Sequence, residues 1–150
     1  MTEFHPVEER DLASLTALWR ATDLSRPWNP AEADIASLRA HPEAEILVAH
    51  DAGQVIASVA VGHDGHRGWA YYVATDPAHR GRGLGRAAMR AAEDWASARG
   101  VVKLMLMVRE SNTAVLGFYA RLGYSDAGVR VMQKWLDPER AVSYAAGRHD

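Results

Sequence analysis

The sequence predicts a single α/β (α+β) domain with a mixed, mostly antiparallel sheet, and three patterns predict it. Two short apolar runs, Ile46–His50 and Val55–Val61, are bounded by turn residues, which is typical of antiparallel strands. A third run, Trp69–Thr75, leads into a glycine-rich loop and a long amphipathic helix. Another apolar run, Val101–Val108, follows that helix. A strand, a helix and a second strand in this order indicate a right-handed parallel crossover.

Composition sets the limits of this fold. At 150 residues, 48% of them hydrophobic, the chain is long enough for one domain with a sizeable core. A net charge of −2 gives no sign of a nucleic-acid partner. The absence of cysteine excludes a disulfide framework and a thiol nucleophile. The N-terminus does not resemble a signal peptide and no apolar run is as long as a membrane span, so we expect a cytoplasmic protein with no membrane partner.

Two helices are expected before the first hairpin. Asp11 is expected to cap the first helix, which should end around Thr22. Its apolar stripe consists of Leu12, Leu15, Leu18 and Trp19. The second helix should cover Ala31–Ala40, because His41-Pro42 stops it.

Two tight turns and one long helix connect the strands. Asp51–Gln54 should join the first pair of strands, and Asp64-Gly65 is a strong signal for a second hairpin. The helix after the glycine-rich loop should end at Gly100. Its expected apolar stripe consists of Leu84, Ala88, Ala91, Ala92, Trp95 and Ala98.

The last third of the chain should add a helix and a strand. Ser111 or Asn112 can cap a helix over Thr113–Leu122, which Gly123 ends. Val129–Trp135 is expected to form the last strand. From Asp137 onward the sequence is polar and without a period, which indicates a mobile tail. The expected organisation is therefore a domain over residues 1–136 and a C-terminal tail over 137–150.

The glycine-rich loop is the clearest candidate for a ligand site. Three glycines within five residues, Gly81, Gly83 and Gly85, lie where a strand passes to a helix N-terminus. Glycines let a ligand approach the backbone closely, and the free N–H groups of the first helical turn favour an anion. Nearby positive charge comes from Arg80, Arg82 and Arg86. This pattern predicts a pyrophosphate cradle; the alternative is a glycine-rich turn with arginines on a solvated face.

Two other phosphate loops do not fit this stretch. A Walker loop needs a lysine directly after its last glycine, and no glycine here is followed by one. The dinucleotide fingerprint G-x-G-x-x-G requires a different spacing of the last glycine. What remains is Arg80-Gly81-Arg82-Gly83-Leu84-Gly85, which fits [QR]-x-x-G-x-[GA].

That hexapeptide resembles the acetyl-CoA loop of the GNAT superfamily of N-acyltransferases. A second block, Asn112-x4-Gly117-Phe118-Tyr119-x2-Leu122-Gly123-Tyr124, resembles a helix of the same family. The likeness extends from about residue 3 to residue 136. It implies the GNAT fold, with a seven-stranded sheet splayed between strands 4 and 5 and about four helices. It also implies acetyl-CoA as cofactor and CoA as product.

The resemblance assigns roles to residues of this chain. The Val73 main-chain amide would donate to the developing oxyanion, and Tyr119 would protonate the leaving thiolate. The alternative is that Tyr119 has no role in the reaction and is an ordinary core aromatic at helical spacing. The residues that the resemblance places against acetyl-CoA are Val73, Ala74, Thr75, Arg80, Gly81, Arg82, Gly83, Leu84, Gly85, Arg86, Asn112 and Tyr119.

A finer likeness, to the YpeA-like bacterial subgroup of this family, concerns the loop between the first two helices and the hairpin at Asp64-Gly65. In GNAT proteins that loop forms a wall of the acceptor pocket. The residues that would contact the acceptor are Asp23, Arg26, Trp28, Asn29 and Tyr71. The alternative is a loop pinned by proline and tryptophan that only covers the core edge.

The general base is not evident from the sequence. Many relatives carry a glutamate near the position of Tyr71 or Tyr72, and this chain has none there. His63, His66 or Asp64 would then deprotonate the amine, unless the two histidines are only solvent-facing turn residues or the amine binds in its neutral form. His63-x2-His66 lacks an evident third ligand, so we expect no metal site.

The sequence therefore predicts an N-acetyltransferase that moves an acetyl group from acetyl-CoA to a primary amine by direct attack. The acceptor is a small-molecule amine or a protein amino group. The alternative is a non-catalytic acyl-CoA-binding or regulatory module, and a nucleotide-binding domain is a third reading. We expect a monomer or a homodimer.

Overall fold

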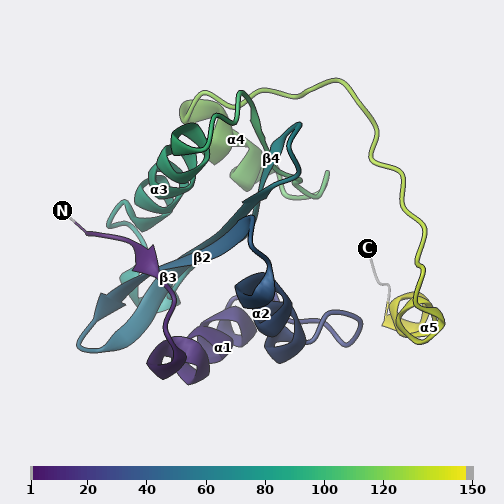
Figure 1. Ribbon diagram of the computed structural model, residues 1–150, viewed down its shortest axis with the longest axis horizontal. Helices are drawn as coiled ribbons and strands as arrows, with labels where there is room; N and C mark the ends of the chain where they lie inside the picture. Colours follow the sequence, from purple (N-terminus) through teal and green to yellow (C-terminus); the bar gives the residue numbers. More distant parts are fainter. Residues whose placement is uncertain (1, 148–150) are drawn as a thin grey trace. The chain divides into compact units, whose positions relative to one another are not determined.

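The structure is a computed structural model that describes residues 2–147 (Figure 1). The chain forms two compact units, Met1–Leu106 and Met107–Asp150. The first unit contains the sheet and three of the α-helices, and the second contains two further α-helices. No described helix is both long enough and apolar enough to cross a lipid bilayer.

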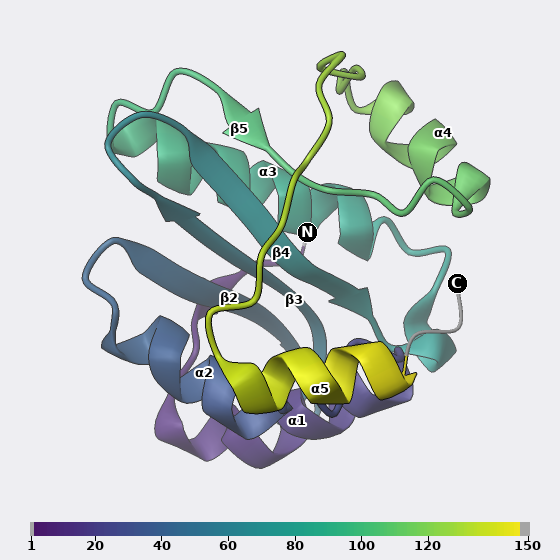
Figure 2. The same ribbon diagram turned by 90° about the vertical axis from the view of Figure 1, so that its right-hand side faces the viewer.

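The first unit is built on a five-stranded sheet in the order β1-β2-β3-β4-β5. Figure 2 shows the strands β2 to β5 of this sheet. The strands β1 to β4 are antiparallel to their neighbours, whereas β5 is parallel to β4. Their bounds are β1 His5–Pro6, β2 Ala44–Asp51, β3 Gln54–His63, β4 Gly68–Thr75 and β5 Leu104–Met105. The mixed sheet and the parallel crossover are thus confirmed.

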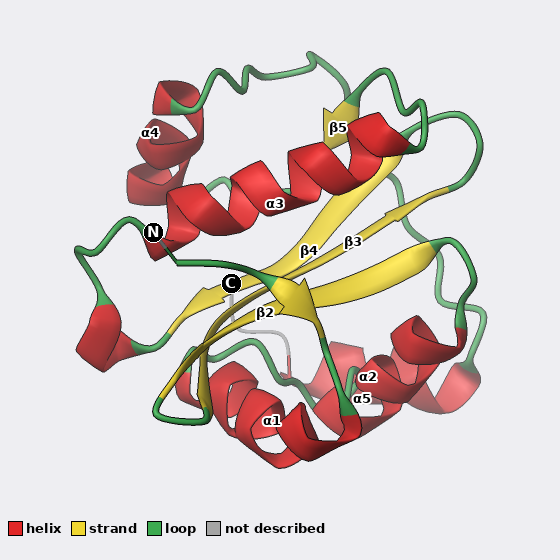
Figure 3. Cartoon of the chain, turned by 60° about the vertical axis from the view of Figure 1, so that its left-hand side comes forward, coloured by secondary structure: helices red, strands yellow, loops and turns green. Residues whose placement is uncertain are grey.

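Helices cover both faces of this sheet (Figure 3). The helices α1 (Leu12–Ala21) and α2 (Ala31–Ala40) pack on one face, and α3 (Leu84–Ala98) packs on the other. The larger core cluster lies under α1 and α2, and its fully buried members include Leu15, Trp19, Ile46 and Val48. A smaller cluster on the α3 side consists of Ala49, Ile56, Ala57 and Leu84.

Elements with a strong local signal lie where the sequence predicts them. The helix α2 has the predicted bounds, and the two hairpin turns follow β2 and β3 as expected. In α3 the buried side is rotated slightly from the predicted stripe, because Met89 and Ala96 are buried while Ala98 is exposed.

Asp11 does not cap α1 as predicted. A short 3-10 helix, η1 (Glu9–Asp11), precedes α1, so Asp11 already has helical backbone angles and its side chain caps η1 through a capping box with Glu8 rather than α1. Its carboxylate is buried instead, where it accepts a hydrogen bond from the Glu8 amide at 2.9 Å and lies 2.7 Å from His50 Nε2. The long-range partner His50 explains the difference.

The predicted central strand Val101–Val108 is wrong in extent. Only Leu104 and Met105 pair with β4, opposite Gly68 and Trp69, and Val102 is 84% exposed. Since β4 continues to Thr75 without β5 partners, the two strands pair at one end only. An apolar run alone does not show how many residues a neighbouring strand pairs with.

In the second unit, α4 (Thr113–Arg121) is confirmed, but the predicted strand Val129–Trp135 is wrong. No described strand pairs with that segment, and a strand without a partner leaves its backbone groups unpaired. Where a tail was expected, Pro138–Gly147 forms α5. Asp137-Pro138, a capping residue before a proline, is the signal for this helix, and Asp137 Oδ1 accepts from the Glu139 amide at 3.0 Å.

The counts therefore differ from the expectation. Residues 2–147 contain five strands and five α-helices, instead of a seven-stranded sheet with about four helices. The α+β class and the mixed sheet hold, because they depend on the hairpins and on the crossover.

Candidate functional site

The glycine-rich loop joins β4 to α3 by backbone that only glycine adopts easily. After β4 the chain forms a short 3-10 helix, η2 (Pro77–His79), and then passes through Gly81 at φ +80° and Gly83 at φ +75°. A Cβ atom at Gly81 or Gly83 would meet no described atom within 4 Å. The left-handed backbone therefore faces open space, and a ligand can approach it closely.

The charge around this loop is free to bind an anion. Arg80, Arg82 and Arg86 are exposed, and within residues 2–147 no acidic side chain pairs with them. Gly83 is the N-cap of the fifteen-residue helix α3, so the free amides and the positive dipole end of its first turn lie at the same loop. Loop and charges together have the features that the predicted cradle for a phosphate-bearing ligand requires.

Two residues that the sequence analysis missed anchor the loop to the sheet. His79 Nε2 lies 3.0 Å from Asp51 Oδ2 in the β2–β3 hairpin, and its Nδ1 lies 3.7 Å from Asp76 Oδ2. Asp76 caps η2 by accepting from the Ala78 amide at 2.9 Å, and its own amide donates to the Ile56 carbonyl at 2.8 Å. The Asp-Pro dipeptide signals the cap, but the contact with Asp51 spans 28 positions and has no local signal.

A bulge interrupts β4 just before the loop. Ser58 pairs with Ala74 and Ala60 with Tyr71, so Tyr72 and Val73 together lie opposite Val59. Tyr72 has φ +54°, a left-handed conformation that is strained for a residue with a side chain. The bulge interrupts the regular ladder at Tyr72 and Val73, at a level of β4 where β5 has no paired residue.

Three side chains from other elements hold this bulge. The hydroxyl of Ser58, which is fully buried, donates to the Tyr72 carbonyl at 2.9 Å and accepts from Trp19 Nε1 at 3.0 Å. The Trp19 and Tyr72 rings stack with centroids 3.8 Å apart, and the Tyr72 hydroxyl donates to Asp34. The sequence analysis assigned none of these three partners to the site. A serine within an otherwise apolar strand was the one available signal.

In the second unit, the predicted residues lie on α4. Asn112 is its N-cap position, but the Asn112 side chain makes no capping bond. The helix ends in a Schellman motif, in which the Tyr124 amide donates to the Tyr119 carbonyl at 3.0 Å and the Gly123 amide to the Ala120 carbonyl at 3.1 Å. Gly123 has the required positive φ of +94°.

The same motif orients Tyr119. Its ring contacts that of Tyr124 edge-on, with centroids 5.8 Å apart. Burial raises the pKa of Tyr119 above its usual value of 10.0, so the phenol keeps its proton at neutral pH. The spacing of Tyr119, Gly123 and Tyr124 thus has a structural reason within this unit.

The predicted acceptor loop is held largely by its own contacts. Arg26 Nη1 donates to Asp23 Oδ1 at 2.9 Å, and the main chains of Arg26 and Asn29 form an isolated bridge. Trp28 is only 8% exposed. The Arg26 guanidinium is therefore engaged by Asp23.

The two candidate histidines lie at the other end of β4. His63 pairs with Gly68, five residues before Val73, which corresponds to roughly 16 Å at strand spacing. His63 Nε2 is 2.8 Å from Glu43 Oε2, and its ring lies 5.9 Å from that of Trp95. His66 is exposed in the hairpin turn. The structure does not bring these residues to the bulge.

Tyr71 lies between these two regions on β4. Its side chain is 41% exposed, and partial burial and the nearby charge of Asp64 raise its pKa. Its ring stacks near that of Trp69 at a centroid distance of 6.4 Å.

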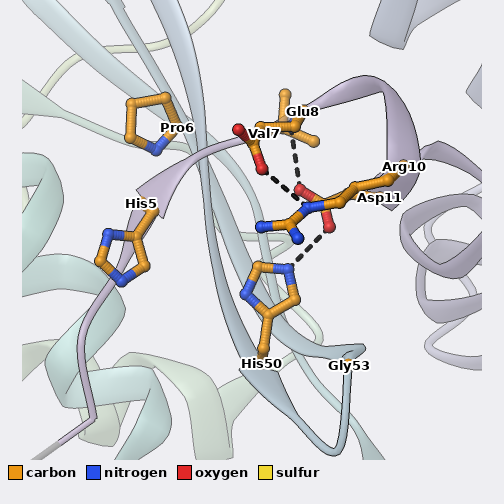
Figure 4. A pocket seen from close by; sticks show the side chains of 8 residues that line it. All are labelled: His5, Pro6, Val7, Glu8, Arg10, Asp11, His50 and Gly53. Carbon is orange, nitrogen blue, oxygen red and sulfur yellow. Dashed lines mark hydrogen bonds and ion pairs between the residues drawn. The ribbon is translucent and has the colours of Figure 1, made fainter.

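A hollow of about 730 Å³ lies elsewhere on the first unit (Figure 4). Burial acts to raise the pKa of Asp11 in this hollow, but its hydrogen bonds with His50 and the Glu8 amide outweigh that and lower it. None of the predicted site residues lines it; its lining consists of His5, Pro6, Val7, Glu8, Arg10, Asp11, His50 and Gly53. Of the residues 2–147, no group of three or more His, Asp or Glu side chains is placed to hold a metal ion.

Comparisons with known proteins agree with this geometry. Residues 12–124 match the model of the family described as Acetyltransferase (GNAT) family. An acetyltransferase from Trypanosoma brucei is 25% identical, with 90% of this chain and 100% of that chain covered and a TM-score of 0.71. The ribosomal-protein-S18-alanine N-acetyltransferase from Escherichia coli is also 25% identical, with 87% and 81% covered and a TM-score of 0.73. Aminoglycoside N-acetyltransferase AAC(6')-Iy, solved in complex with CoA, shares the fold at 13% identity, with 91% and 96% covered and a TM-score of 0.77.

Proposed function

The chain belongs to the acetyltransferase (GNAT) family, and we propose that it is an N-acetyltransferase that moves an acetyl group from acetyl-CoA to a primary amine by direct attack. One observation supports this most strongly. A glycine loop with open space and unpaired arginines directly follows a bulge at Tyr72 and Val73 of the same strand.

The loop would bind the diphosphate of acetyl-CoA. Main-chain amides from Gly81 to Arg86 would donate to the phosphate oxygens, with charge supplied by Arg80, Arg82 and Arg86. The main chain of Val73, Ala74 and Thr75 would run beside the pantetheine arm. Asn112, from the second unit, would add a further contact.

In the reaction, the amine nitrogen forms a bond to the acetyl carbonyl carbon and then the bond from that carbon to sulfur breaks. The Val73 amide would stabilise the oxyanion of the tetrahedral intermediate. Tyr119 would give its proton to the leaving thiolate and recover one from the nitrogen, through solvent. The raised pKa of Tyr119 suits this role, because the group must be protonated when the thiolate leaves.

For the acceptor, we propose a primary amine that enters in its neutral form. An alkylammonium has a pKa of about 10.4, so a small neutral fraction is present at neutral pH. The positions of His63 and His66 do not favour a role as base, since both lie at the far end of β4. The acceptor loop of Asp23, Arg26, Trp28 and Asn29, together with Tyr71, would select the amine. Membership of the YpeA-like subgroup is part of this proposal.

A second function is favoured by one observation. The strand β4, Gly68–Thr75, carries no acidic residue beside the bulge. A module that binds acyl-CoA without catalysing a reaction would need no general base at this position. Such a module would keep the cradle but would not need the Tyr119 hydroxyl.

Two measurements separate these functions. Calorimetric titration with acetyl-CoA should show binding under either function. Release of CoA thiol should then be followed with a panel of amino acids, polyamines, aminoglycosides and peptides with free N-termini. Thiol release that depends on one amine class supports the enzyme, and binding without release on the whole panel supports the module. Binding of ATP or NAD but not of CoA would overturn both.

A further inference from the structure

The peptide group between Tyr72 and Val73 is the central feature of the bulge. Its carbonyl is that of Tyr72, which accepts from the Ser58 hydroxyl at 2.9 Å. Its N–H is that of Val73, the proposed oxyanion donor. No peptide bond of the described chain is cis, so the C=O and N–H of this group point in opposite directions.

The direction of the N–H therefore depends on what holds the C=O. Ser58 belongs to β3, and its hydroxyl is tied on the other side to Trp19 Nε1 of α1. A carbonyl drawn toward β3 and α1 turns the Val73 N–H away from them, toward the side of β4 where β5 lies in the sheet order. There β5 pairs with Gly68 and Trp69 only, so no described strand pairs with Val73 on that side.

We infer that Ser58 is a positioning residue for acetyl transfer, whose hydroxyl fixes the Tyr72–Val73 peptide plane and so aims and polarises the Val73 N–H. The inference rests on the proposed function for its catalytic meaning. Polarisation follows because a hydrogen bond at the C=O end of an amide strengthens donation at its N–H end. Burial excludes water as a substitute donor, since Ser58 is fully buried.

The Trp19 bond provides a matched control. Trp19→Phe removes the Nε1–H that Ser58 accepts from, yet keeps an aromatic ring to stack on Tyr72 and leaves the Ser58 hydroxyl free to donate to the Tyr72 carbonyl. Both Trp19→Phe and Ser58→Ala should lower thermal stability, because each disturbs a fully buried contact. Only Ser58→Ala removes the bond at the Tyr72 carbonyl.

The test measures kinetics and the Val73 amide signal in wild type, Ser58→Ala and Trp19→Phe. Loss of a complete oxyanion donor costs about 10²- to 10³-fold in kcat, so a misaimed donor in Ser58→Ala should cost about tenfold, with the KM for acetyl-CoA little changed. The Val73 amide resonance should move upfield in Ser58→Ala without any ligand. In wild type, the chemical shift of the Val73 amide should also change when acetyl-CoA is added, but not when CoA is added. Trp19→Phe should keep most of its kcat and the wild-type Val73 signal.

The outcomes are separable. A Val73 signal that is the same in Ser58→Ala as in wild type overturns the positioning role, whatever the activity. An equal loss of kcat in Trp19→Phe and Ser58→Ala also overturns it, because stability alone would then explain the loss. If Ser58→Ala does not fold, Ser58→Cys, a weak donor of similar shape, takes its place with a smaller effect expected in the same direction. A wild type that binds acetyl-CoA but transfers it to no amine overturns the proposed function, and the apo Val73 signal then still decides whether Ser58 sets the peptide plane.

Discussion

The glycine loop and the bulge of β4 are two departures from regular backbone within a dozen residues, and they are built in different ways. The loop reaches positive φ at Gly81 and Gly83, where no side chain opposes it. The bulge reaches positive φ at Tyr72, where Ser58 bonds the main-chain carbonyl while the Trp19 ring and Asp34 contact the Tyr72 side chain. The loop is therefore a local device, for which we propose ligand binding, whereas the bulge is maintained by packing, and we propose that it serves the chemistry.

The largest effect is expected from a substitution that disrupts the loop and leaves the bulge unchanged. Gly83→Val places a branched side chain at φ +75° in the space proposed for the diphosphate, so CoA affinity should fall by about 100-fold or more, or about 2.7 kcal/mol. Calorimetric titration measures this. Gly65→Val is the matched control, since Gly65 has φ +88° with open space around it but lies in the β3–β4 hairpin. Equal losses of affinity in both variants would contradict the cradle.

The second prediction concerns a substitution that should lower the rate of acetyl transfer without changing the loop. Tyr119→Phe removes the proposed acid and should lower kcat by about 10²-fold, while CoA affinity stays within about twofold of wild type. Phe118→Leu, which alters the neighbouring ring of α4, is the control for a general disturbance of that helix. Turnover of Tyr119→Phe at the wild-type rate would remove Tyr119 from the mechanism.

The pH dependence sharpens this assignment. Burial raises the pKa of Tyr119 above 10.0, so at least about nine tenths of the phenol stays protonated, and able to act as an acid, up to about pH 9. In wild type, kcat should therefore show no decline between pH 7 and pH 9. A decline with a midpoint below pH 9 that disappears in Tyr119→Phe would show that the pKa is lowered and would contradict the assignment.

A smaller effect is expected at the anchor of the loop. His79→Ala removes the contact with Asp51 and leaves the glycines unchanged, so CoA should bind about three- to tenfold more weakly, or about 0.7–1.4 kcal/mol. Asp51→Ala should match it, and the double variant should add little beyond either change alone. Strictly additive losses in the double variant would show that the two side chains do not act as a pair.

The same contrast explains what the sequence could predict. The loop and the Schellman motif of α4 were predictable because glycine is the residue that adopts positive φ most easily. Gly81, Gly83 and Gly123 therefore indicate in the sequence itself where the backbone has positive φ. The bulge was not, because Tyr72 fits the strand pattern and its partners Trp19, Asp34 and Ser58 are 14 to 53 positions away. The strand predicted at Val129–Trp135 failed for a related reason, since pairing depends on a partner that a local pattern does not reveal.

The central claim is that the glycine loop grips the diphosphate of coenzyme A. Its most direct test compares calorimetric titrations of the wild-type protein with CoA and with pantetheine, which carries the same thiol arm but no diphosphate. We predict that CoA binds at least about 100-fold more tightly than pantetheine. Equal affinity for the two ligands would contradict the claim.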